Sequence, residues 1–234
     1  MTRFDAITSD LRITGGPSGY TAARDGTGGL LSSDNEDIRC GQSPSGYYVY
    51  RGYAAFDTSP IPDGDTVTSV SLGLKIQQDN SASDFVVQVW KYDWKYVPNG
   101  TGVGTGNLRQ YVFQLISSGA NNNAAAVLET AAGASQSTAG KTAGSWMVFT
   151  GLSTSWVSKA GSTKYVLRSA KDTSAIAPTS EEWVKFYSAN DGTYTNRPYL
   201  DIEYSSGGGG APTTTRRMRI YAGVIGPIAF QELG

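Results

Sequence analysis

The stretch of residues 51–77, RGYAAFDTSPIPDGDTVTSVSLGLKIQ, contains two strand patterns separated by a turn. In its second half, apolar residues alternate with small or polar ones from Val70 to Ile76, which is the period of a strand with one face on a core. Between the halves, two prolines fix the backbone and cannot donate hydrogen bonds to a sheet, and Asp63-Gly64 is typical of a turn. The stretch therefore predicts a strand, a corner where the chain changes direction, and a second strand.

The composition favours a single all-β domain. The 234 residues are enough to bury one sizeable core, and 29 Gly, 14 Tyr and 5 Trp favour strands and turns over helices. The net charge of -1 gives no overall field that would recruit nucleic acid, and no apolar run approaches the ~18 residues of a membrane span. We therefore expect an antiparallel β-sandwich that has neither nucleic acid nor a membrane as its partner.

Strand patterns recur along the rest of the chain. They cover residues 86–94, 110–116, 146–149, 164–169, 183–188 and 199–204. Two short helical segments are expected, in residues 124–134 and 152–159. The predicted core includes Phe56, Val70, Leu72, Leu74, Trp90, Leu200 and Ile202.

These segments resemble a known family. An aromatic-rich strand that ends in FDTS and continues as IPDGDTVTSVSLGL is similar to the R-x-F-D-x-S-x-I-P-x-G pattern of DNRLRE-type domains, and NRPYLDIEY is similar to their last strand. The resemblance covers roughly residues 20–205 and departs from the family in a long loop between Ser117 and Ser145 and in a C-terminal tail. It implies a jelly-roll sandwich that serves as a surface, adhesive or virion module, and it does not imply an enzyme.

The chain divides into four expected parts. They are an N-terminal arm (1–19), the sandwich (20–205), a Gly-rich linker (206–212) and a C-terminal tail (213–234). The N-terminus lacks an apolar stretch of signal-peptide length, so we expect a protein that is made in a host cytoplasm.

The tail combines arginines with apolar side chains. It is too apolar to be left in water and too short to fold alone, so we expect it to dock on neighbouring subunits by strand addition and apolar contacts. The candidate assembly residues are Arg216, Arg217, Arg219, Ile220, Tyr221, Val224, Ile225, Ile228 and Phe230.

Few residues suit catalysis or metal binding. The sequence has no histidine, which removes Ser-His-Asp and Cys-His catalysis and most zinc sites. Its single cysteine, Cys40, cannot form an internal disulfide and is expected to be a small buried residue. Asp34, Glu36 and Asp37 could supply oxygen ligands to a structural Ca²⁺, but their spacing does not match an EF-hand loop and favours a solvated loop. We expect no cofactor.

Aromatic residues alternate along the 90–96 stretch. Alternate residues of a strand share a face, so this row would stack on sugar rings if exposed and would form core if buried. The candidate glycan-binding residues are Tyr92, Trp94 and Tyr96, and a second candidate set before the corner is Tyr47, Tyr48 and Tyr50.

Together these observations favour a structural virion protein of a tailed phage. It would decorate or cement the capsid, or belong to the tail, and would contact major capsid or tail subunits. We expect a homo-oligomer, and because jelly rolls often cluster around threefold axes, a trimer is one candidate. The alternative is a carbohydrate-binding or adhesion module that recognises surface polysaccharide. A glycosidase that uses two carboxylates is a third and weaker hypothesis.

Overall fold

The computed structural model describes residues 11–15, 19–25, 30–34, 37–93, 127–206 and 215–221 of the chain. The strands are β1 (Leu11–Gly15), β2 (Leu30–Asp34), β3 (Ile38–Ser43), β4 (Tyr48–Asp57), β5 (Thr66–Asp79), β6 (Val86–Asp93), β7 (Val127–Leu128), β8 (Ala134–Ser137), β9 (Trp146–Thr150), β10 (Ser162–Ser169), β11 (Glu182–Phe186), β12 (Tyr199–Ser205) and β13 (Thr215–Tyr221). The helical segments are α1 (Tyr20–Asp25), η1 (Thr154–Trp156), α3 (Ala170–Thr173) and η2 (Tyr194–Asn196). No helix among these residues is long and apolar enough to cross a membrane.

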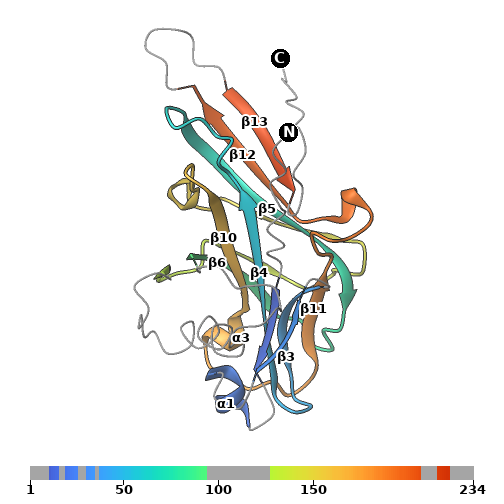
Figure 1. Ribbon diagram of the computed structural model, residues 1–234. Helices are drawn as coiled ribbons and strands as arrows, with labels where there is room; N and C mark the ends of the chain where they lie inside the picture. Colours follow the sequence, from blue (N-terminus) through green and yellow to red (C-terminus); the bar gives the residue numbers. More distant parts are fainter. Residues whose placement is uncertain are drawn as a thin grey trace.

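The strands form an antiparallel sheet that curls on itself. Its main path runs β13-β12-β5-β11-β3-β4-β10-β6-β7, with β1 on β4, β2 on β1, β8 on β6 and β9 on β5. Figure 1 shows β12 and β13 side by side at one end of the molecule and α1 at the opposite end. The predicted all-β antiparallel sandwich is confirmed, and its jelly-roll topology stays a prediction.

Strand β5 connects the two layers of the sandwich. Its first part, residues 66–73, pairs with β12, and its last part, residues 76–79, pairs with β11. The predicted corner lies between β4 and β5, which are not paired with each other, so the chain crosses there from one layer to the other. Ile61 of the corner is buried between the layers, while Pro60 and Pro62 are exposed.

Alternate side chains of the long strands meet between the layers. Strand β5 buries Val70, Leu72, Leu74 and Ile76, as its alternation predicted. The remaining predicted core residues that are confirmed are Phe56, Leu200 and Ile202.

The prediction that Trp90 belongs to the core is wrong. Strand β6 turns Val87 and Val89 toward the core, so Trp90 is half-buried on the opposite face of the sheet, where the guanidinium of Arg168 lies 5.5 Å from its ring centroid. The sequence offered two apolar rows on β6, and the smaller β-branched row is the one that fills the space between the layers.

The other expected elements are partly confirmed. The helical turn expected in residues 152–159 is η1. The prediction of a helix in residues 124–134 is wrong for the described part of this segment, because β7 and the first residue of β8 pair there with β6. Strand pairing overrides the helix propensity of this Ala-rich segment. The strand expected in residues 110–116 lies outside the described residues.

The sheet also extends beyond the expected bounds of 20–205. Strand β1, in the expected arm, pairs with β2 and β4, and β13, in the expected tail, pairs with β12.

Candidate functional site

The C-terminal segment forms the last strand of the molecule's own sheet. β13 pairs with β12 over seven residues, from Tyr199↔Tyr221 to Ser205↔Thr215. Met218 and Ile220 point into the sandwich and are 2% and 8% exposed. Ile220 was expected to dock on a partner, and this expectation is corrected, because its side chain is covered by the core of its own chain.

A polar and aromatic cluster holds β13 on its other face. Arg219 donates from Nε and Nη2 to the two carboxylate oxygens of Asp201, each at 2.6 Å, and its guanidinium lies 4.1 Å from the ring centroid of Tyr199. The Tyr199 and Trp146 rings lie 5.0 Å apart. The Tyr199 ring lies over Gly73, its register partner on β5, where a Cβ atom would come within 2.2 Å of a ring carbon. A bidentate pair of this kind fixes orientation as well as position, so β13 is held in a defined register.

Strand β13 lies at the end of the sheet path. Within the described residues it pairs with β12 alone, so its second edge is the edge of the sheet. Arg216, Arg217 and Tyr221 belong to this strand, whereas Val224, Ile225, Ile228 and Phe230 lie outside the described residues. Unpaired strand edges are templates for pairing with another chain, and charged side chains restrict which chains can add. We call residues 215–221 the β13 edge and take it as the candidate site.

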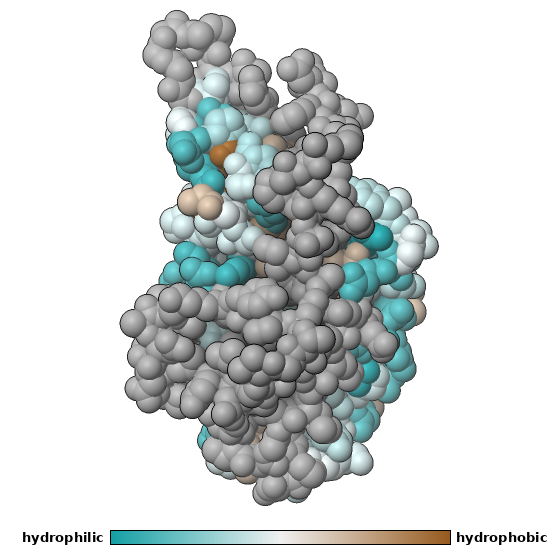
Figure 2. Space-filling view, in the orientation of Figure 1, coloured by the Kyte–Doolittle hydropathy of each residue, from teal (hydrophilic) through white to brown (hydrophobic). Residues whose placement is uncertain are grey.

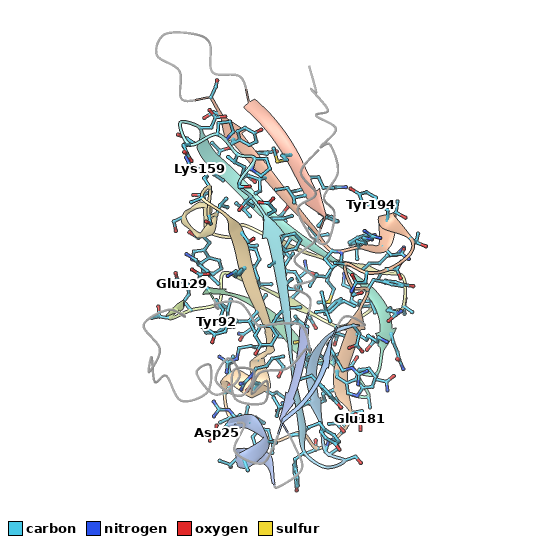
Figure 3. All side chains as sticks on the ribbon, in the orientation of Figure 1. Asp25, Tyr92, Glu129, Lys159, Glu181 and Tyr194 are labelled. Carbon is cyan, nitrogen blue, oxygen red and sulfur yellow. The ribbon has the colours of Figure 1, made fainter. Side chains whose placement is uncertain are left out.

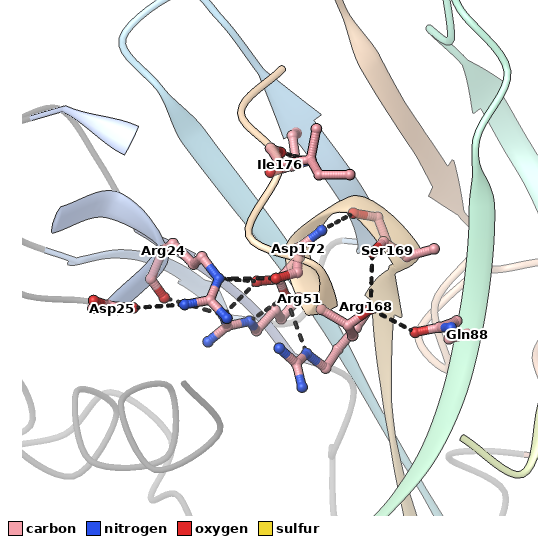
Figure 4. Close-up of polar contacts among 11 residues, drawn as sticks. Arg24, Asp25, Arg51, Gln88, Arg168, Ser169, Asp172 and Ile176 are labelled. Atoms are coloured by element: carbon pink, nitrogen blue, oxygen red, sulfur yellow. Dashed lines mark hydrogen bonds and ion pairs between the residues drawn. The ribbon is translucent and has the colours of Figure 1, made fainter. Parts of the chain in front are cut away.

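A second cluster is built on a buried ion pair that the sequence did not predict (Figure 4). Arg51 of β4 donates from Nε and Nη2 to the carboxylate of Asp172 in α3, at 2.8 and 2.7 Å. Arg168 of β10 donates to the same carboxylate at 3.1 Å, and Arg24 of α1 donates to the Asp172 carbonyl at 2.9 Å. The hydroxyl oxygen of Ser169 accepts the Asp172 N–H at 2.9 Å and caps α3. Asp172 therefore joins two strands and two helices.

The electrostatics of this cluster favour a permanent charge on Asp172. Burial raises the pKa of a carboxyl group, but the charges and hydrogen bonds of Arg51 and Arg168 outweigh it, and the pKa of Asp172 lies well below its usual range. Burial lowers the pKa of Arg168, whereas at Arg51 the opposing attraction of Asp172 prevails and raises the pKa. Since Arg51 and Asp172 are essentially inaccessible to solvent, we infer that the cluster stabilises the fold and does not bind a ligand.

Of the glycan-binding residues predicted in the 90–96 stretch, the structure describes Tyr92. Tyr92 is fully buried and its ring lies 6.5 Å from that of Tyr53, so the prediction that it binds glycan is wrong. Trp94 and Tyr96 lie outside the described residues. Tyr92 lies on the same face of β6 as Trp90, away from the sandwich core; the sequence pattern showed a shared face but could not show what covers it.

Of the three acidic residues proposed for calcium, Asp37 is the one whose side chain the structure describes. The Oδ2 atom of Asp37 accepts a hydrogen bond from Arg39 at 3.1 Å and lies 3.5 Å from the ammonium of Lys185. Asp34 belongs to β2, and Glu36 lies outside the described residues. Cys40 is a buried free thiol, as predicted.

Comparison of the sequence with models of known protein families and with curated proteins finds no match. The resemblance to DNRLRE-type domains therefore stays a prediction.

Proposed function

We propose that the chain is a structural virion protein of a tailed phage, and within that class a capsid decoration or cement protein that docks to neighbouring subunits through its C-terminal segment. The observation that carries this proposal is β13. The segment after the Gly-rich linker adds to the sandwich as an edge strand, with two core side chains on one face and the Arg219–Asp201 pair on the other.

The β13 edge suits assembly for a physical reason. An added strand gains main-chain hydrogen bonds along its whole length, and its side chains set the register and the partner. A strand from a capsid or tail subunit, or from another copy in a trimer, can pair with the edge of β13 that carries no other strand among the described residues. The arginines of β13 favour an acidic partner strand.

The residues after Tyr221 supply the apolar part of the contact. Val224, Ile225, Ile228 and Phe230 are large apolar residues, and burying each of them is worth about 1.5 to 3 kcal/mol. Association uses up part of this gain in ordering the segment. The sandwich itself would remain on the particle surface.

The test compares two truncated chains with the full chain. The chain that ends at Tyr221 keeps β13, so we expect the circular dichroism spectrum and the melting temperature of the full chain together with a loss of particle incorporation. The chain that ends at Ser205 also loses Met218 and Ile220 from the core, so we expect a lower melting temperature. Incorporation of the Tyr221-terminated chain at full occupancy would show that the residues after Tyr221 are not needed for docking, and would leave the β13 edge as the docking element.

A further inference from the structure

The outer face of β3, β4 and β11 carries a group of aromatic rings. Gly41 of β3 is the register partner of both Trp183 on β11 and Tyr50 on β4. Register partners share a face of the sheet, and this face is opposite to the one on which Cys40 and Val184 enter the core. A Cβ atom at Gly41 would lie 2.5 Å from the Cα atom of Trp183, and the φ of Gly41 is +130°. Glycine therefore allows the backbones of β3 and β11 to approach closely here. On this face the rings of Trp183 and Tyr50 meet edge to face, 6.1 Å apart.

Two further side chains extend this group toward solvent. The guanidinium of Arg39 lies 4.3 Å from the ring centroid of Trp183 and 5.0 Å from that of Tyr50. Tyr48 stacks on Tyr50 with their centroids 6.2 Å apart and an angle of 27° between the rings. We call Arg39, Tyr48, Tyr50 and Trp183, together with Tyr47 that precedes Tyr48 in the chain, the aromatic platform.

Tyr47 is the most exposed residue of the platform. It ends the turn between β3 and β4 with a φ of 52°, a left-handed conformation that is unusual for a bulky residue, and it is 42% exposed. Backbone strain of this kind persists where the surrounding structure imposes it and is frequent at binding sites. Tyr47 is not among the buried core residues, so packing in the core does not account for a tyrosine here.

Polar groups beside the rings carry both signs of charge. Glu181 accepts hydrogen bonds from Trp183 Nε1 and from the Ser43 hydroxyl, each at 2.7 Å. Asp37 lies between Arg39 and Lys185 at 3.1 and 3.5 Å. The two carboxylates and the two cations give this surface no net charge. It therefore offers both hydrogen-bond donors and acceptors without attracting a charged partner.

The described residues that are visible in Figure 2 are mainly hydrophilic. Glu181 lies at the end of the molecule where β3 and β11 are found, and β13 lies at the opposite end (Figures 1 and 3). A ligand bound at the platform therefore leaves the β13 edge accessible.

We propose that the aromatic platform binds a neutral saccharide chain. The C–H faces of pyranose rings stack on Tyr47 and Tyr48, while sugar hydroxyls donate to Glu181 and accept from Lys185 and Arg39. Flat aromatic faces together with balanced donors and acceptors fit an uncharged polyol better than a nucleic acid, which requires an excess of positive charge. An acidic polysaccharide is disfavoured in the same way by Glu181 and Asp37.

Isothermal titration calorimetry of the full chain tests this site. The probes are cellohexaose, maltohexaose, chitohexaose and mannohexaose, with heparin, polygalacturonate and a proline decamer as comparisons. We expect saturable binding of at least one neutral hexasaccharide and a loss of about tenfold in affinity in both Tyr47→Ala and Tyr48→Ala, equivalent to about 1.4 kcal/mol. The matched control is Tyr194→Ala, which removes a tyrosine that is 46% exposed elsewhere on the surface and should bind as the unmodified chain does.

A further variant separates binding from folding. Tyr47→Gly removes the ring and suits the left-handed backbone, so it should lose binding while its melting temperature stays the same or rises. Absence of saturable binding to all four neutral probes, unchanged affinity in both tyrosine variants, or preferential binding of the proline decamer or a polyanion would each overturn the proposal. Particle incorporation is not part of this readout, so the result is independent of the proposed assembly function.

Discussion

Replacing Asp172 by asparagine should destabilise the fold more than any other single charge removal in the described residues. The substitution keeps the shape of the side chain and removes a carboxylate that accepts from both Arg51 and Arg168. Arg51 is fully buried, with 0% of its side chain exposed. Removing one partner of a buried pair leaves an uncompensated charge and typically costs about 3 to 5 kcal/mol. The total stability of a natural domain is about 5 to 15 kcal/mol, so Asp172→Asn should lose a large part of it.

Equilibrium unfolding in urea, followed by far-ultraviolet circular dichroism, measures this loss. The matched control is Asp93→Asn, which breaks the pair of Asp93 with Lys164 at 3.4 Å, where the carboxylate is 60% exposed. Surface pairs are worth about 0 to 1 kcal/mol, so the control should remain close to the unmodified chain. A change below about 1 kcal/mol for Asp172→Asn would refute the reasoning, because it would mean that Arg51 and Arg168 are compensated without this carboxylate.

The same variant predicts a change in pH dependence. The pKa of Asp172 is lower in the folded than in the unfolded state, so its contribution is complete above the unfolded value of about 3.9 and is lost as the pH falls below it. The stability difference between the unmodified chain and Asp172→Asn should therefore be constant near neutral pH and shrink in acid. A difference that grows in acid would contradict the assignment.

Three further substitutions or treatments test other parts of the structure. Gly73→Ala places a methyl group against the Tyr199 ring, so we expect a loss of about 1 to 3 kcal/mol in urea unfolding and faster amide hydrogen exchange in β13; unchanged exchange would show that Tyr199 does not hold this strand. Met218→Ala removes a side chain that is 2% exposed and should cost about 2 to 5 kcal/mol, whereas an effect near zero would mean that β13 is not docked in solution. Cys40 is buried and its thiol pKa is raised by burial, so Ellman's reagent should react with it only after unfolding and dithiothreitol should not change the melting temperature; rapid reaction of the native chain would contradict the burial of Cys40.

Local alternation predicted the strands whose one face is apolar and whose other face is polar. In β5, serines and glycine separate Val70, Leu72 and Leu74, so only one orientation can bury the apolar face. The same pattern failed at Trp90, because both faces of β6 carry large or apolar residues. A single strand does not reveal which of two such faces meets the second layer.

Contacts between residues far apart in the sequence could not be predicted from local sequence patterns. Arg51 and Asp172 are 121 positions apart, and the available signal was only an arginine in the middle of an otherwise apolar and aromatic strand. The tail shows a similar limit. Met218 and Ile220 have strand spacing and the linker is long enough to fold back, but an apolar excess alone does not distinguish docking on the same chain from docking on a neighbour.

Density-gradient sedimentation of purified phage particles, with the protein followed by mass spectrometry, tests whether this chain is a virion component. The chain should sediment with the particles in a fixed ratio to the major capsid subunit, and a chain that ends at Tyr221 should remain at the top of the gradient with soluble protein. If the full chain also remains at the top while the particles are intact, it is not a structural virion protein.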